Sequence, residues 1–180
     1  MSEGSMKLRG RVRAVLGDNI DTDIIYPGRY LNITDREKTA EHLFELAYPE
    51  IREGLKPGEL IVAGRNFGCG SSREQAAAAL KFAGAGAVIA ASFARIFFRN
   101  AINLGLPAIV AGDMAGNCSA GDDLEIDLVA GRIQNLTRGR ESETAPLDPR
   151  AAELLAAGGL IPYLKRRYTQ ERRDSCPGIV

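Results

Sequence analysis

Residues 60–80 read LIVAGRNFGCGSSREQAAAAL, and this stretch decides the fold. Its first five residues are apolar or small, which is typical of a strand that is buried on both faces. Its last ten residues, from Ser71 to Leu80, are mostly strong helix formers. The glycine-rich residues 65–70 join the two parts, so the sequence predicts a buried strand that passes through a short loop into a helix.

The same alternation continues after this stretch. Gly84 or Gly86 ends the first helix, and a second apolar run follows it. The next predicted elements are a strand over residues 87–90, a helix over residues 92–104 and a strand over residues 106–110. Strand, helix, strand, helix, strand is typical of parallel strands joined by helical crossovers.

Weaker patterns flank this layer on both sides. A strand, a loop with two acids and a helix are predicted before it, and a hairpin and a helix after it. These elements fall at residues 7–16, 20–25, 35–46, 122–136 and 151–157. Thr34 or Asp35 is the expected N-cap of the helix over residues 35–46. The predicted class is therefore α/β, with both parallel and antiparallel strand pairing.

The length of 180 residues fits one domain, which we expect to span residues 6–168. Residues 1–5 look like an expression leader or tag, and residues 169–180 like a polar, mobile tail. No run reaches the ~18 apolar residues of a membrane-spanning helix, and we read no signal peptide.

Charge and metal-ligand content exclude several classes of protein. The chain has 23 Lys and Arg against 23 Asp and Glu, whereas a nucleic-acid-binding surface needs a basic excess. Its three cysteines, Cys69, Cys118 and Cys176, are far apart, and His42 is the single histidine. We therefore expect neither a disulfide framework nor a metal site in this chain, and a reducing, cytoplasmic setting.

The loop between the first predicted buried strand and its helix has the features of an anion site. Gly68 and Gly70 permit close backbone approach. Ser71 and Glu74 have the spacing of a capping box, and a helix start offers unpaired N–H groups to an anion. Arg73 has the side chain that clamps a carboxylate through two parallel hydrogen bonds.

Two other interpretations of this loop stay open at this point. In the first interpretation, Ser71 is only the N-cap of the helix. In the second the loop binds a phosphate or a dinucleotide, although its glycine spacing matches neither common motif. The residues by themselves indicate an anion site with a candidate basic serine, and they do not give the reaction.

Three segments resemble one known family. Residues 66–74, residues 92–103 and residues 17–25 are similar, in the correct order, to segments of the swivelling domain of the aconitase superfamily. The free-standing domain resembles the small subunits of the 3-isopropylmalate dehydratases in that superfamily. The resemblance implies a swivelling β/β/α domain with mixed parallel and antiparallel sheets.

The resemblance also implies the chemistry. In that family a large subunit carries a [4Fe–4S] cluster, and the two chains form a heterodimer or heterotetramer that dehydrates and rehydrates di- or tricarboxylates. Ser71 then matches the catalytic base and Asp23 an acid of the active site, while Ser72 and Arg73 match contacts to a substrate carboxylate. Cys69 is expected to pack against the loop, because one cysteine is not a cluster site.

The loop after Asp23 is where this family reads the variable part of its substrate. Tyr30, Leu31, Asn32 and Ile33 are the candidate contacts. Tricarboxylate-specific relatives place an arginine near the position of Asn32, so we hypothesise an alkyl substituent, as in 3-isopropylmalate of leucine biosynthesis. A homoaconitase, a dimethylmalate- or citraconate-type hydro-lyase and a non-catalytic carboxylate-binding module stay open as alternatives.

Overall fold

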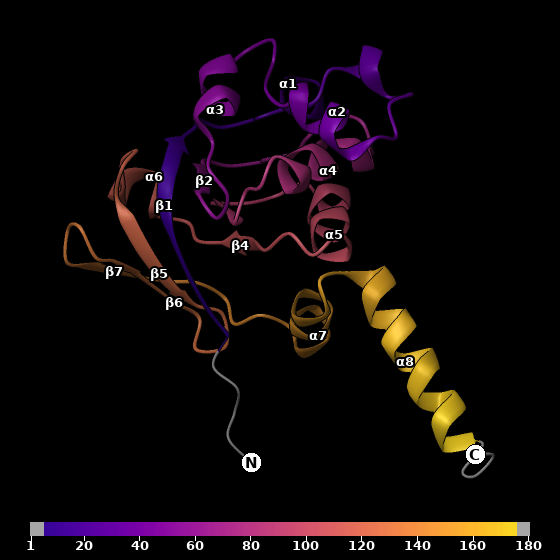
Figure 1. Ribbon diagram of the computed structural model, residues 1–180. Helices are drawn as coiled ribbons and strands as arrows, with labels where there is room; N and C mark the ends of the chain where they lie inside the picture. The colour runs from indigo at the N-terminus through magenta and orange to yellow at the C-terminus, as the bar shows by residue number, and fades with distance from the viewer. Residues whose placement is uncertain (1–5, 176–180) are drawn as a thin grey trace.

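The computed structural model describes residues 6–175 as a sheet of seven strands with helices packed against it (Figure 1). The order across the sheet is β4-β3-β2-β1-β5-β6-β7. The strands are β1 (Lys7–Val15), β2 (Leu60–Ala63), β3 (Ala87–Ala90), β4 (Ala108–Val110), β5 (Asp123–Asp127), β6 (Arg132–Asn135) and β7 (Arg140–Glu143).

Strand β1 joins a parallel half of the sheet to an antiparallel half. Its end pairs in parallel with β2, with a register shift between Val12 and Ala14. Its beginning pairs antiparallel with β5. Strands β2, β3 and β4 are all parallel, whereas β5, β6 and β7 form an antiparallel meander. The predicted parallel layer, the hairpin and the mixed α/β class are therefore confirmed.

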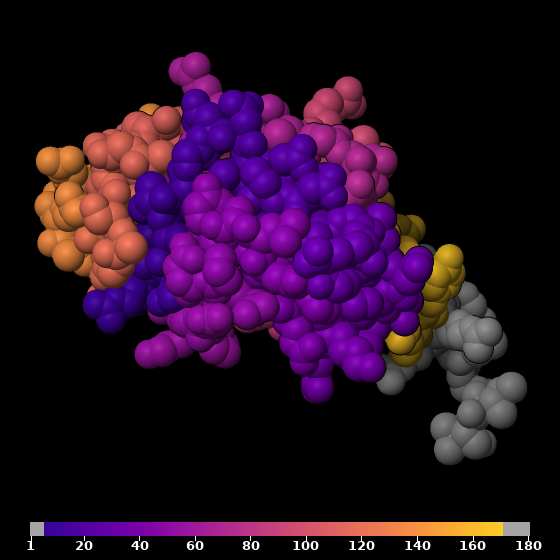
Figure 2. Space-filling view, turned by 90° about the horizontal axis from the view of Figure 1, so that it is seen from above, coloured from indigo at the N-terminus to yellow at the C-terminus, as the bar shows by residue number. Residues whose placement is uncertain are grey.

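The helices fill the connections. They are α1 (Thr22–Ile25), the 3-10 turn η1 (Gly28–Tyr30), α2 (Arg36–Glu41), α3 (Pro49–Gly54), α4 (Glu74–Phe82), α5 (Arg95–Asn103), α6 (Met114–Asn117), α7 (Pro149–Ala157) and α8 (Leu160–Ser175). In Figure 2 the early segments, indigo to purple, cover one face of the molecule, with the meander at one side and α8 at the other.

The parallel strands are buried on both faces. Ile61, Ala63 and Val88 belong to one core with helices α4 and α5, whereas Val62 and Ile89 belong to a second core with α6 and the antiparallel strands. Each face of β2 and β3 therefore needs apolar side chains, which is why these strands read as continuous apolar runs.

Several boundaries differ from the sequence prediction. The predicted acidic loop contains the one-turn helix α1, because the Asp21 carboxylate accepts a hydrogen bond from Asp23 N at 2.5 Å. Helix α2 ends at Glu41 rather than near residue 46, because Phe44 has a positive φ of 53° and donates its N–H to Ile25 O at 2.9 Å. The sequence did not predict α3, α6 or β7.

Helix α8 extends away from the rest of the molecule in Figure 1. It continues through Ser175, so the predicted polar tail begins inside this helix. The possible leader (residues 1–5) and Cys176 lie outside the described residues. Within residues 6–175, no helix combines the length and the apolar character needed to cross a membrane.

Candidate active site

The loop that follows β2 has a backbone that only certain residues accept. Asn66, Gly68 and Gly70 have φ values of 61°, 74° and 90°. A Cβ added at Gly68 would lie 2.2–2.6 Å from the Phe97 side chain. Glycine is therefore required at this position by both its positive φ and the close approach of α5.

The loop is fastened on one side to the connection between β1 and α1. Gly68 N donates to Ile20 O at 2.7 Å, and Thr22 N donates to Cys69 O at 2.8 Å. These bonds place the turn at Asp21 and Asp23 beside the loop, although the two segments are nearly fifty residues apart in the sequence.

The loop is fastened on its other side to the connection between β3 and α5. Asn66 N donates to Ser92 Oγ at 2.8 Å, and Phe67 N donates to Ser92 O at 2.9 Å. Ala94 N returns a bond to Phe67 O at 2.9 Å. The three segments that carry the family resemblance thus lie side by side at the carboxyl ends of β2 and β3, where α/β sheets bind ligands.

Asp23 and Arg73 form an ion pair within this arrangement. The Asp23 carboxylate also accepts a hydrogen bond from Gly28 N at 3.0 Å. The Asp23 side chain is 54% exposed and the Arg73 side chain 22%, so the pair lies at the surface with its acid outward. Arg73 is therefore held in place by an acid from another segment, with its side chain partly exposed.

Ser71 and Ser72 are exposed next to this pair. The Ser71 carbonyl accepts hydrogen bonds from Arg73 N at 2.8 Å and from Thr22 Oγ1 at 3.3 Å. The predicted capping box is wrong, because helix α4 begins at Glu74 and its N-cap is Arg73, without a side-chain cap. Ser71 is therefore not the N-cap of α4, and the Ser71 hydroxyl does not cap this helix.

The predicted substrate-reading residues divide into two pairs. The ring of Tyr30 and the side chain of Leu31 pack against the core. The Tyr30 carbonyl accepts a hydrogen bond from Tyr26 Oη at 2.9 Å. Asn32 is exposed and Ile33 is half-buried. Tyr30 and Leu31 therefore anchor the loop, and Asn32 and Ile33 are presented beyond the anchor.

The two described cysteines lie in different environments. Cys69 and Cys118 are both free thiols, and Cys69 is half-buried in the loop. Burial raises the pKa of the Cys118 thiol to about 11, so it stays protonated at neutral pH. In the part of the chain that the structure describes, no three His, Cys, Asp or Glu side chains are grouped to hold a metal ion.

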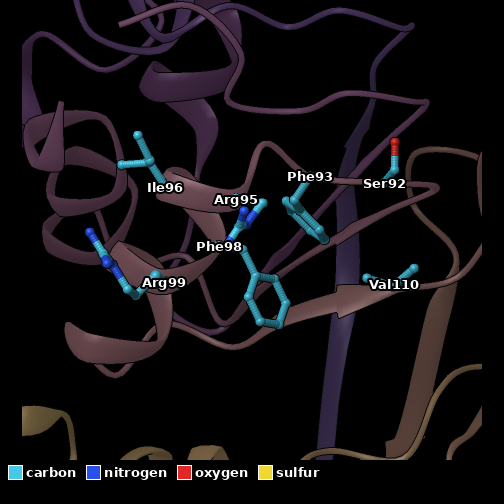
Figure 3. A pocket seen from close by; sticks show the side chains of 7 residues that line it. All are labelled: Ser92, Phe93, Arg95, Ile96, Phe98, Arg99 and Val110. Carbon is cyan, nitrogen blue, oxygen red and sulfur yellow. The ribbon is translucent and has the colours of Figure 1, made fainter. Parts of the chain in front are cut away.

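A groove beside the loop was not predicted from the sequence. It has a volume of about 710 Å³ and lies between α5 and the end of β4. We call it the α5 groove, and it is lined by Ser92, Phe93, Arg95, Ile96, Phe98, Arg99 and Val110 (Figure 3). The sequence signal is the dense mixture of aromatic residues and arginines over residues 92–99. Ser92 lines this groove and also accepts the hydrogen bond from Asn66 N in the loop after β2.

Comparisons with known proteins agree on one family. A family model described as the aconitase C-terminal domain matches residues 19–111. The 3-isopropylmalate dehydratase small subunit of Thermodesulfovibrio yellowstonii is 49% identical over 166 residues, which are 92% of this chain and 98% of that protein. The methanogen homoaconitase small subunit of Methanothermobacter thermautotrophicus is 53% identical over 159 residues, 88% of this chain and 91% of that protein.

A solved structure has the same fold. The crystal structure of 3-isopropylmalate dehydratase from Methanocaldococcus jannaschii superimposes with a TM-score of 0.86 at 44% identity. The match covers 94% of this chain and 99% of that chain. The expectation of a swivelling domain of the aconitase type is thereby confirmed.

Proposed function

The chain belongs to the aconitase C-terminal domain family, and on that premise we propose that it is the small subunit of a two-subunit hydro-lyase that interconverts 2- and 3-isopropylmalate. Dehydration and rehydration of the substrate would serve leucine biosynthesis. Relatives that are named small subunits of such enzymes match over nearly their whole length, which supports this assignment. The observation that carries it is the exposed cluster of Ser71, Ser72, Arg73 and Asp23 at one edge of the sheet.

Each residue of this cluster has a proposed task. The Ser71 hydroxyl, as its alkoxide, takes the proton next to a substrate carboxylate. Arg73 binds that carboxylate through its guanidinium, and the Ser72 hydroxyl donates a further hydrogen bond. Asp23 holds Arg73 in position. The positive charge of Arg73 and the nearby start of helix α4 both favour a negative charge on the serine oxygen.

The partner is proposed to be a large subunit that carries a [4Fe–4S] cluster. Residues 6–175 of this chain do not offer a matching set of ligands, so the cluster belongs to the other chain in this proposal. The cluster, when bound there, supplies a Lewis acid for the departing hydroxyl group. This chain supplies the base and part of the carboxylate site.

We also propose that the large subunit covers the α5 groove. The groove adjoins the loop after β2, because Ser92 lines the groove and accepts a hydrogen bond from Asn66 N of that loop. A partner that closes over Ser71 therefore approaches along the same edge of the sheet. Ile96 and Val110, 43% and 41% exposed, both line this groove, so apolar side chains are exposed together there. Arg95 and Arg99 beside them favour an apolar partner segment that is flanked by acids.

The substrate proposal rests on the loop beyond the Tyr30 anchor. Asn32 has no positive charge with which to bind an extra carboxylate, and Ile33 offers apolar surface. Both features favour an alkyl substituent. A homoaconitase is the second candidate, because the relative with that name is 53% identical. We propose a reducing, cytoplasmic setting, which the free thiols of Cys69 and Cys118 support.

Assembly with the large subunit tests this function. The two chains are co-purified and assayed with 3-isopropylmalate, homocitrate and citrate, and kcat/KM is compared among the three. We expect activity only when both chains are present, with 3-isopropylmalate preferred. A preference for a tricarboxylate would move the assignment to the homoaconitase type. If the large subunit alone is equally active, this chain is a non-catalytic module.

A further inference from the structure

One carboxylate, that of Glu45, holds three side chains together beside the substrate-reading loop. Arg29 Nη2 and Tyr30 Oη lie 2.8 and 2.9 Å from Glu45 Oε1, and His42 Nδ1 lies 2.6 Å from Glu45 Oε2. The Tyr30 ring stacks on His42 with centroids 3.6 Å apart, and the Arg29 guanidinium lies 4.8 Å from the centre of the Tyr30 ring. We call these four residues the Glu45 cluster.

The cluster is more ordered than an isolated surface ion pair. The side chains of His42 and Glu45 are only 23% and 25% exposed. His42, Tyr30 and Arg29 all lower the pKa of Glu45, so this carboxylate stays ionised at neutral pH. The backbone adds to the order, since Phe44 between them is fully buried with a positive φ, which a non-glycine residue adopts only when its surroundings require it.

The cluster fixes one end of a short turn whose other end touches the candidate active site. Turn η1 spans Gly28–Tyr30. Gly28 N donates to Asp23 Oδ1 at 3.0 Å, and a Cβ added at Gly28 would lie 2.9 Å from Arg73 Nη1. Tyr30, at the other end, is bound to Glu45. The position of this turn against Asp23 and Arg73 thus depends on the Glu45 cluster.

The cluster also binds the single basic side chain of residues 26–34, that of Arg29. Arg29 is the only lysine or arginine among residues 26–34. Its guanidinium is bound to Glu45 and lies over Tyr30, so it is directed towards the α2 side of the loop. Arg29 directly follows Gly28, whose N–H is bound to Asp23 of the candidate site, so an Arg29 side chain released from Glu45 would extend from a residue next to that site.

We propose that Glu45 and His42 are positioning residues that set substrate specificity, because they keep Arg29 away from the substrate and so exclude a third carboxylate. The inference rests on the proposed function, and it concerns which substrates, dicarboxylates or tricarboxylates, the same site accepts. A free Arg29 would supply the cation that Asn32 lacks, and the pocket would then accept tricarboxylates. The selectivity for an alkyl substituent therefore comes in part from a carboxylate that does not touch the substrate.

The test uses three variants in the assembled two-subunit enzyme: Glu45→Gln, Arg29→Ala and the double variant. We expect Glu45→Gln to raise the ratio of kcat/KM for homocitrate to that for 3-isopropylmalate about two- to fivefold, the range expected for an ion pair whose arginine side chain is 56% exposed. Arg29→Ala should leave the ratio unchanged, and the double variant should lose the gain. A purely structural role would lower kcat/KM for both substrates together in all three variants.

The outcomes separate this inference from the proposed function. An equal loss on both substrates in Glu45→Gln, or a gain that survives in the double variant, overturns the specificity role. A wild-type complex that is inactive on every substrate overturns the proposed function and the specificity role together. Hydrogen exchange of residues 28–33 in the full chain is a separate check of the cluster: Tyr30→Phe and Glu45→Gln should both accelerate it, and unchanged exchange in both would show that the cluster does not hold the loop.

Discussion

Arg73 and Asp23 are 50 positions apart in the sequence and form an ion pair at the edge of the sheet. The pair joins the loop after β2 to the turn before residues 26–34, the candidate substrate loop. Gly28 N shares the Asp23 carboxylate, so the pair also positions the start of that loop. A change to either residue should therefore affect substrate binding more than folding.

Replacement of Arg73 by lysine tests the carboxylate site. Lysine keeps the positive charge but cannot form two parallel hydrogen bonds with a carboxylate. Arg73→Lys should lower kcat/KM about 10- to 100-fold in the two-subunit enzyme, mainly through KM. Arg9→Lys, at an exposed position on β1, is the control and should change nothing. A normal KM in Arg73→Lys would mean that Arg73 does not bind substrate.

Gly68→Ala tests whether the loop needs its backbone geometry. The alanine Cβ would overlap the Phe97 side chain, and the φ of 74° is unfavourable for it. We expect a loss of about 2–5 kcal/mol in the free energy of unfolding, from left-handed strain and overpacking together. Gly112→Ala, whose Cβ would meet nothing within 4 Å, is the control. Urea denaturation of the full chain measures both, and equal midpoints would contradict this packing.

The Asp122 network predicts a pH dependence of stability. Asp122 accepts hydrogen bonds from Asn135 Nδ2 at 2.9 Å, Ser119 N at 3.0 Å and Arg138 Nε at 2.6 Å. These partners, the Asn135 amide first, lower the pKa of Asp122 below its ordinary 3.8. The unfolded chain therefore binds a proton more readily, and the stabilisation present above pH 3.8 is lost as the pH falls through the lower folded-state pKa.

Asp122→Asn should remove that dependence. We expect the variant to be less stable by about 1–3 kcal/mol at neutral pH, because the negative charge beside Arg138 is lost and the new amide group cannot accept all three hydrogen bonds, including that of the buried Asn135. Below pH 4 the gap between the variant and the wild type should narrow. Urea midpoints measured across this range provide the check, and a constant gap at every pH would contradict the assignment.

The α5 groove predicts where the large subunit binds. Ile96→Glu should weaken the complex at least about tenfold in Kd, since a charge would replace an apolar contact at the centre of the interface. Val129→Glu is a matched control, because Val129 is 43% exposed like Ile96 but lies on the turn after β5. Titration calorimetry with the purified large subunit measures both. Equal affinities would exclude the groove as the interface, and a change only in self-association would assign it to a second copy of this chain.

The parallel layer could be predicted from the sequence because its strands are buried on both faces and glycines mark its turns. The helix starts were predicted unevenly: Asp35 is the N-cap of α2, as expected, whereas the capping box of Ser71 and Glu74 does not form. Ser71 and Glu74 have the spacing of a capping box, but Arg73 has an extended backbone and forms an ion pair with Asp23, and helix α4 begins only at Glu74. Strand β7 was missed because it is a polar edge strand with one buried residue, Ser142.

The site was only partly predictable for a similar reason. Family resemblance, rather than spacing, indicated that residues 17–25, 66–74 and 92–103 act together, since their convergence depends on the order of the strands. The contacts of His42 with Glu45 and Tyr30 form in the turn that follows the early end of α2 at Glu41. Such contacts between loops leave no periodic pattern in a sequence.

The central claim is that the hydroxyl of Ser71 is the base of the reaction, and Ser71→Ala tests it most directly. Wild type and variant are assembled with the large subunit, and kcat for dehydration of 3-isopropylmalate is measured at saturating substrate. The account predicts that kcat falls about 10²- to 10⁴-fold while the complex still forms and KM changes little. An unchanged kcat in a correctly assembled complex would contradict it.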